Sequence, residues 1–365
     1  MNRSRGAHSR GLARSELVAV MVVLLVLATL LAPVLARVSG LSANQVSLNN
    51  LRVLHGGHTC YAADWADRQF TAVPDDLSEL GGTWASYTEA TGSYPPLLLG
   101  WGPGAGGPIC EPGYTCGRWA YWGDWPGNNF VVTLPISFDS TTPSGIVGAF
   151  RLGNAWPLHE YMAEGTGRFY DPVFYSPLDR LAYETIGDAD FEFDPALPLV
   201  TSSYVLSPAA MYHPEVLRPR SEGGYQDPAS FAEGFQSPPV SQVVYADLKS
   251  RLIEHAWLTD PPGPCNETFT DPHLPDSFPC SQYLFNHGAE AAPLTLFFDG
   301  SIQPLRTGDV AAADELLLKS TGDGLWSRDT PLGELGYFGE ASFDRTVVSH
   351  HILTTGGIQG RDRLR

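Results

Sequence analysis

The sequence predicts an α+β protein in which a long N-terminal helix, membrane-spanning in its first half, packs on an antiparallel β-sheet domain with loop-rich insertions. Three observations carry this prediction. An uncharged apolar run lies near the N-terminus, short β-rich runs recur in the rest of the chain, and 38 Gly and 30 Pro in 365 residues indicate many turns. The hydrophobic fraction of 43% is that of a globular protein with a sizeable core.

The apolar run extends from Leu17 to Ala36 without a charged side chain. About 20 helical residues cover roughly 30 Å, which is the thickness of the hydrocarbon core of a bilayer. Basic side chains concentrate before the run, and this asymmetry predicts a cytoplasmic N-terminus and an exported C-terminal domain. The basic residues concerned are Arg3, Arg5, Arg10 and Arg14.

The helix is expected to continue beyond the membrane segment, and residues 37–70 are predicted to form a helical extension and a junction. Between Leu41 and Asp67 apolar residues recur at helical spacing despite the Gly56-Gly57 pair. These residues are Val46, Leu48, Leu51, Val53, Leu54 and Tyr61.

Residues 71–365 are predicted to form one exported globular domain built on an antiparallel sheet. Short runs rich in β-branched and aromatic residues stand between Gly and Pro turns, and no internal repeat is visible. The expected strands are Phe130–Leu134, Ile146–Phe150, Gln242–Ala246 and Leu294–Phe298.

The charge of this body excludes one class of partner. From Leu17 onward the chain has 18 basic and 39 acidic residues, a net charge of about −21. Such a body repels nucleic acid and anionic membrane surfaces, so no nucleic-acid partner is expected.

The five cysteines include two pairs that are close in sequence. Cys110 with Cys116, and Cys265 with Cys280, lie in Gly/Pro-rich stretches, while Cys60 is left over. Reduced, buried thiols are one interpretation, but export to an oxidising compartment favours two local disulfides. The chain contains no CxxC pair, so the sequence gives no support to a zinc ribbon.

Two targeting signals could use the apolar run. A secretory signal peptide would be cleaved after Ala36, with Pro33 ending the apolar helix. The other signal is indicated by Gly11, just before the run, and by Glu16, five residues later. A carboxylate so close to a membrane span costs free energy, which favours a functional role for it.

Gly11, Leu12 and Glu16 resemble the N-terminal signal of type IV pilins and type II secretion pseudopilins. In that family, prepilin peptidase cleaves after a glycine, the new first residue is N-methylated, and the acid at mature position five is functional. The resemblance implies a leader of residues 1–11, a transmembrane helix of residues 12–36, and a charge pair between Glu16 of one subunit and the Leu12 amine of its neighbour. Pro33 also matches a proline common in pilins, whereas Ala13 and Arg14 depart from the family pattern.

Further segments are similar to the H-X9-DG group of pseudopilin-like proteins. His287 and the Asp299-Gly300 pair resemble the motif that names the group, although eleven residues separate them instead of nine. The other matching segments, in chain order, are Ser47–Arg52 with Tyr61–Asp64, Phe174–Asp179, and Ser202–Tyr204.

The residues of this motif also have plain structural interpretations. The Asp299-Gly300 pair predicts a two-residue hairpin turn, because Asp tolerates left-handed geometry and Gly has no side chain to clash. His287 as a metal ligand or catalytic base is the alternative to a hydrogen-bonded structural histidine, and the structural role is favoured.

Three other stretches are candidate binding sites. The acids from Asp188 to Asp194 alternate with apolar residues, which predicts a strand with one acidic face; calcium binding is the alternative. His55, His58 and Cys60 have ligand-like spacing, but a junction between helix and domain is favoured over a metal site. The aromatic cluster Trp119–Trp125 is expected in the core rather than on a sugar-binding or protein-binding surface.

We therefore expect a structural subunit and not an enzyme, since the chain contains no GxSxG, Walker, HExxH or dinucleotide motif. The resemblance implies inner-membrane localisation and two kinds of partner, prepilin peptidase and other pilin or pseudopilin subunits. No cofactor is expected, with calcium as the open alternative. The competing function is an exported hydrolase or carbohydrate-binding domain released by signal peptidase.

Overall fold

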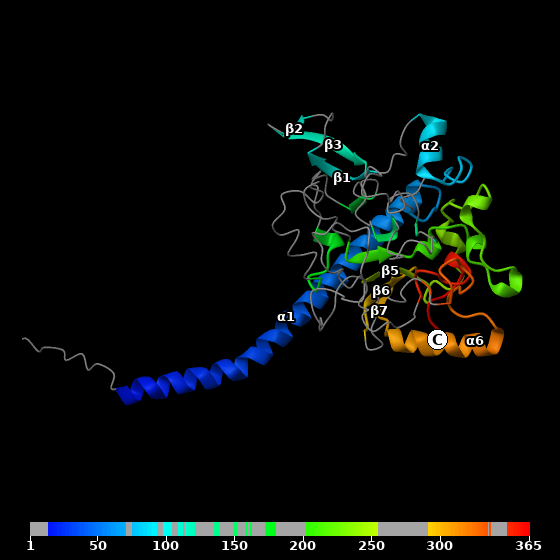
Figure 1. Ribbon diagram of the computed structural model, residues 1–365. Coiled ribbons are helices and arrows are strands. Elements are labelled where there is room, and N and C mark those ends of the chain that lie inside the picture. The colour runs from blue at the N-terminus through cyan, green and yellow to red at the C-terminus, as the bar shows by residue number, and fades with distance from the viewer. Residues whose placement is uncertain are drawn as a thin grey trace, which may run out of the picture. The chain divides into compact units, whose positions relative to one another are not determined.

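The computed structural model shows a mixed α+β protein (Figure 1). The chain divides into two compact units, Met1–Gln45 and Val46–Arg365. The described residues are 14–70, 75–92, 98–103, 109–111, 114–120, 135–136, 138, 149–151, 158, 161–162, 172–179, 202–254, 291–334, 336 and 349–365.

Helix α1 (Arg14–Asp64) is continuous through the boundary between the two units. In the first unit the apolar side chains of Val20, Met21, Val22 and Val23 are each 50–57% exposed. Within the described residues we find no helix whose length and apolarity would let it span a bilayer.

In the second unit, one face of α1 is buried at intervals of three and four residues, as a helix packed along one side requires. The buried residues of this face are Ser47, Leu51, Leu54, His58, Tyr61 and Ala62. The predicted amphipathic extension is thus confirmed at Leu51, Leu54 and Tyr61. Val46 and Val53 were wrongly placed on the buried face, since they are 41% and 47% exposed.

The helix ends at Asp64, before the predicted end of the junction at residue 70. Ala66 and Asp67 adopt positive φ angles of 55° and 65°, which an α-helix cannot accommodate. The Asp67 amide donates to the carbonyl of Ala62 at 2.7 Å, satisfying one of the last helical carbonyls.

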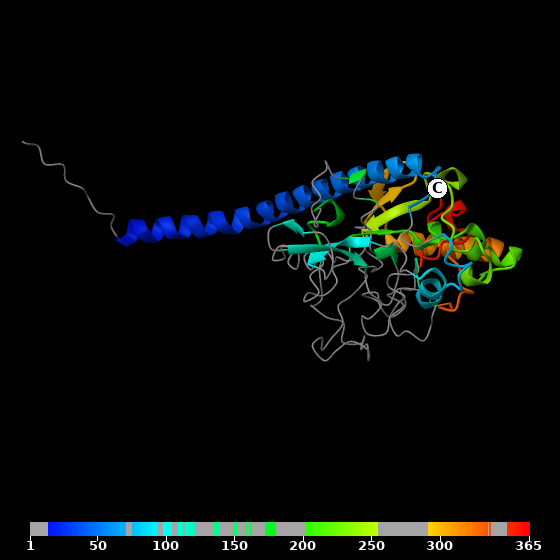
Figure 2. The same cartoon turned by 90° about the horizontal axis from the view of Figure 1, so that it is seen from above.

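The core of the second unit is a four-stranded antiparallel sheet in the order β4-β5-β6-β7. Figure 2 shows the second half of α1 running beside this sheet. Strands β5 and β6 occupy the centre, where their buried residues Leu252, Ile253 and Leu296 pack in the main hydrophobic core. The strands are β4 (Tyr204–Leu206), β5 (Ser250–Glu254), β6 (Leu294–Phe297) and β7 (Ile302–Pro304).

A second sheet among the described residues has three antiparallel strands in the order β1-β3-β2: β1 (Leu98–Pro103), β2 (Ile109–Glu111) and β3 (Tyr114–Ala120). Further α-helices are α2 (Trp84–Thr91) and α6 (Thr307–Thr321). Helix α6 ends at Gly322, which has a φ of 83° and donates its amide to Leu318 O, a left-handed C-cap.

The sheet-forming predictions were right in part. Leu294–Phe298 is confirmed as β6, except that Phe298 lies in the turn. Strand β4 begins at Tyr204, the last residue of the matching segment Ser202–Tyr204. Gln242–Ala246 was wrong, since it contains the end of a 3-10 helix (Val240–Gln242) and the turn into β5. Pro239 starts that 3-10 helix, and its carbonyl accepts from the Gln242 amide at 3.0 Å.

Two further strand predictions lie wholly or partly outside the described residues. The segment Phe130–Leu134 lies outside the described residues. The last two residues of Ile146–Phe150 are described, and Ala149 and Phe150 belong to a 3-10 helix (Ala149–Arg151) instead of a strand. The Phe150 amide donates to the carbonyl of Pro135 at 3.2 Å.

The predicted hairpin turn at Asp299-Gly300 connects β6 to β7, but its loop has three residues rather than two. The Phe297 amide donates to Ser301 O at 2.9 Å, and the Gly300 amide donates to Phe297 O at 3.0 Å. Only Gly300 is left-handed, with a φ of 84°, while Asp299 uses its Oδ1 to accept from the Ser301 amide at 2.9 Å. This is the geometry of a turn followed by a left-handed residue.

Candidate functional site

Two buried polar clusters stand out in the second unit. The helix-contact cluster joins α1 to the sheet and consists of Ser47, Asn50, Ser176, Tyr204 and Glu254. The C-terminal cluster joins the start of β5 to the last residues of the chain and consists of Ser207, Lys249, Ser250, His351, Thr354 and Asp362.

The helix-contact cluster is centred on the carboxylate of Glu254, which is fully buried at the end of β5. Its Oε1 accepts hydrogen bonds from Ser47 on α1 and from Ser176 Oγ at 3.3 Å. Its Oε2 accepts from the amide of Leu294, the first residue of β6, at 2.9 Å. One side chain therefore connects the helix to two strands.

Tyr204 and Asn50 complete this cluster. The Tyr204 hydroxyl lies 2.8 Å from Ser47 Oγ, and Asn50 Nδ2 donates to it at 3.3 Å and to the carbonyl of Tyr175 at 3.0 Å. Beside the cluster, Ser203 Oγ donates to the buried carboxylate of Asp179 at 2.6 Å. The segments that resemble the pseudopilin-like group at Ser47, Phe174–Asp179 and Ser202–Tyr204 thus meet in space.

Burial raises the pKa of Glu254 to about 7, since a carboxylate that is removed from water is disfavoured. The hydrogen bonds from Ser47, the Leu294 amide and Ser176 act in the opposite direction, and the nearby Asp179 raises the pKa further. No cation forms an ion pair with Glu254 among the residues that the structure describes. The helix is therefore attached through an acid whose charge is poorly compensated.

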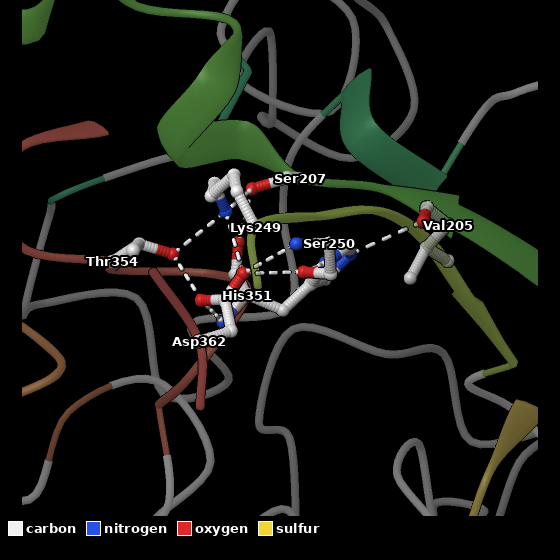
Figure 3. Close-up of polar contacts among 7 residues, drawn as sticks. All are labelled: Val205, Ser207, Lys249, Ser250, His351, Thr354 and Asp362. Carbon is white, nitrogen blue, oxygen red and sulfur yellow. Dashed lines mark hydrogen bonds and ion pairs between the residues drawn. The ribbon is translucent and has the colours of Figure 1, made fainter. Parts of the chain in front are cut away.

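The C-terminal cluster contains an ion pair between two side chains with no exposed surface (Figure 3). Lys249 Nζ donates to Asp362 Oδ2 at 2.8 Å and to Ser207 Oγ and Thr354 Oγ1 at 2.9 Å each, which uses all three of its protons. Burial lowers the pKa of Lys249, while Asp362 acts against that shift.

Both carboxylate oxygens of Asp362 also accept hydrogen bonds. Its Oδ1 accepts from the His351 amide at 2.8 Å and from Thr354 Oγ1 at 2.5 Å, and its Oδ2 also accepts from the Ser250 amide at 2.9 Å. Burial alone would raise the pKa of Asp362, but Lys249 and these donors hold it well below its usual range. The last residues of the chain are thereby attached to β5.

Ser250, His351 and Asp362 are the residue types of a hydrolytic triad, but their arrangement differs from one. Ser250 Oγ lies 2.7 Å from His351 Nδ1 and 2.5 Å from Asp362 Oδ2, so the acid contacts the serine instead of orienting the imidazole. His351 Nε2 is 3.1 Å from the carbonyl of Val205, and burial lowers the pKa of this histidine to about 3. All three side chains are buried, so no substrate can reach the hydroxyl.

The residues of the alternative metal site, His55, His58 and Cys60, are not brought together as ligands. Cys60 is exposed, whereas His58 is buried with its ring 5.7 Å from that of Phe70. Burial and the nearby Arg251 guanidinium lower the pKa of both histidines, and a cation there would be repelled by that guanidinium. In the described part of the chain, no group of three potential ligands is placed to hold a metal ion.

Several of the residues singled out in the sequence lie outside the part of the chain that the structure describes. Gly11, Leu12, Cys265, Cys280, His287 and the acids from Asp188 to Asp194 lie outside the described residues, as does most of Trp119–Trp125. Glu16 belongs to helix α1, and Cys110 and Cys116 belong to the adjacent strands β2 and β3. The structure describes the backbone of these three residues but not their side chains.

Neither cluster was predicted from the sequence. In each cluster the members are more than 100 residues apart at their extremes, and no short-range spacing connects Ser47 to Glu254 or Lys249 to Asp362. Lys249 is followed by the polar Ser250 and the charged Arg251, so nothing in the local sequence indicated that its side chain is buried. Comparisons with protein-family models, with curated proteins and with solved structures found no match for this chain.

Proposed function

We propose that this chain is a membrane-anchored pilin-like or pseudopilin-like structural subunit of a type II secretion or type IV pilus-like system. Prepilin peptidase would remove residues 1–11, and the freed helix would anchor the protein in the inner membrane and assemble with neighbouring subunits. The exported domain would remain attached to that helix.

The observation that carries this proposal is the environment of α1 at Val20–Val23. Four consecutive helical positions cover more than one full turn, and all four carry apolar side chains that are at least half exposed. A helix that is apolar on every side requires lipid or other helices around it. A bundle of identical helices in a bilayer or fibre core supplies that environment.

The helix-contact cluster supports the same proposal. A subunit that is assembled through its helix transmits force between helix and domain, and that connection needs contacts in addition to the covalent chain. Buried hydrogen bonds from Ser47 to Glu254 and from Asn50 to the Tyr175 carbonyl provide them at the start of the second unit.

The proposal is tested by determining the N-terminus of the mature protein from the membrane fraction by mass spectrometry. A mature chain that begins at Leu12, carrying an additional methyl group, supports prepilin processing. A mature chain that begins at Arg37 would instead establish signal-peptidase release and favour the exported hydrolase or binding domain.

Gly11→Leu separates these outcomes further, because prepilin peptidase requires a small residue at that position in the family that the sequence resembles. The variant should accumulate with its leader attached if the proposal holds. Unchanged processing of Gly11→Leu would refute it.

A further inference from the structure

We propose that a recess between the loop at residues 218–224 and the loop at residues 322–328 binds one small oxyanion, such as a carboxylate, phosphate or sulfate group. This inference does not depend on the pilin-like function. The recess is small and partly open to solvent. Its polar and charged lining is supplied by Arg218, Arg220, Asp323, Trp326, Ser327 and Arg328.

Three guanidinium groups in one recess are unusual for a chain with a net charge of −18. Two of them have acidic partners, since Arg328 pairs with the buried Asp314 and Arg218 Nη1 lies 3.0 Å from the half-exposed Glu215. Arg220 forms no ion pair within 4 Å in the described part of the chain. Its charge helps to lower the pKa of the nearby Asp329, but its guanidinium donors are not held in an ion pair and can bind a ligand.

Two further donors in the lining lack an acceptor. Trp326 is only 2% exposed, and its indole Nε1 has no hydrogen-bond partner among the residues that the structure describes. The Nε of Arg218 is likewise buried and unpartnered. A buried N–H group without an acceptor is unfavourable, and here two occur around the same recess.

The acid of the lining does not accept from these donors. Asp323 Oδ1 accepts from the Arg220 amide at 2.8 Å, and Oδ2 accepts from Ser221 Oγ at 2.9 Å. The carboxylate thus holds the 218–224 loop in place and leaves the side chain of Arg220 available. Asp329 fixes the same loop by accepting from the Tyr225 amide at 3.0 Å.

An oxyanion matches this set of donors. Guanidinium groups bind carboxylate, phosphate and sulfate oxygens through charge-assisted hydrogen bonds, and an indole N–H donates well to the same oxygens. Because Asp314 and Glu215 already pair with two of the three arginines, the recess favours a small group with a single negative charge. The natural source is either a free inorganic anion or the carboxylate of a protein partner.

The test is isothermal titration of the full-length chain in detergent with sodium phosphate, sodium sulfate and sodium acetate at constant ionic strength. We expect saturable binding of at least one anion. Arg220→Gln removes an exposed charge and should weaken that binding at least about tenfold. Trp326→Phe keeps the ring but removes the N–H, and should weaken it about threefold or more.

Arg52→Gln is the matched control, because Arg52 is exposed on α1 and lies outside the recess. It should bind the anion as the unaltered chain does, and circular dichroism of each variant checks that it is folded. A preference for acetate would indicate a protein carboxylate as the natural ligand, and a preference for phosphate or sulfate would indicate a free anion. Both support the site.

Two results would overturn the proposal. One is the absence of saturable binding of all three anions. The other is binding that Arg220→Gln and Trp326→Phe leave unchanged, which would identify an adventitious ion only.

Discussion

Glu254→Gln is expected to stabilise the protein at neutral and alkaline pH while changing little in acid. The substitution keeps the shape of the side chain and removes its charge. The amide oxygen can still accept from the Leu294 amide, and the amide nitrogen can donate to Ser47 Oγ. The helix-contact cluster would therefore keep its bonds without a buried carboxylate.

The magnitude follows from the raised pKa. Glu254 has a pKa of about 7 in the folded protein, against an ordinary value of 4.5. Because the folded-state pKa is the higher one, the stability contributed by the protonated acid is fully present below pH ~4.5 and is lost as the pH rises to about 7. A rise in pKa from 4.5 to about 7 corresponds to about 3 kcal/mol of unfolding free energy.

The measurement is the free energy of unfolding by urea of the full chain in detergent, at a series of pH values across this range. The difference between Glu254→Gln and the unaltered chain should grow by about 3 kcal/mol from the acidic to the alkaline end. Glu222→Gln makes the same chemical change at an exposed position and serves as the control. A difference that stays constant with pH would refute the reasoning, since it would mean that Glu254 is ionised equally in both states.

Three further predictions concern other parts of the fold. Lys249→Met should destabilise the protein by about 3–5 kcal/mol in urea unfolding, because it leaves the Asp362 carboxylate buried without its cation, and full stability in this variant would contradict the assigned ion pair. Gly300→Ala should be more destabilising than Gly322→Ala. The two glycines have similar φ angles, 84° and 83°, so the backbone strain is the same in both variants. A Cβ at residue 300 would lie 2.8 Å from His55 Nε2, whereas a Cβ at residue 322 would have no described atom within 4 Å. Equal losses in the two variants would show that the contact is relieved by movement of His55. Peptide mapping without reduction should link Cys110 to Cys116 and Cys265 to Cys280, and four free thiols would contradict both predicted bridges.

The parts of the fold that sequence reasoning found are those with local signals. The helical extension was visible because Leu51, Leu54 and Tyr61 repeat at helical spacing, and β6 was visible because a β-rich run precedes an Asp-Gly pair. The run Gln242–Ala246 had the same composition as a strand but follows two prolines. There the preference of Val243 and Val244 for extended structure lost to turn geometry, and the strand begins only at Ser250.

The joint contact of Arg251 and Glu254 with α1 could not be predicted because it depends on an irregularity within β5. Residues 251 and 254 are three apart, so a regular strand would direct Arg251 and Glu254 to opposite faces. Yet Arg251 Nη2 donates to the α1 carbonyl of His58 at 3.2 Å, and Glu254 bonds Ser47 on the same helix. The pairing of β5 with β6 shifts register between Ser250 and Leu252, and such a bulge redirects the side chains beside it. One extra residue in a central strand thus allows both a buried cation and a buried acid to contact a single helix.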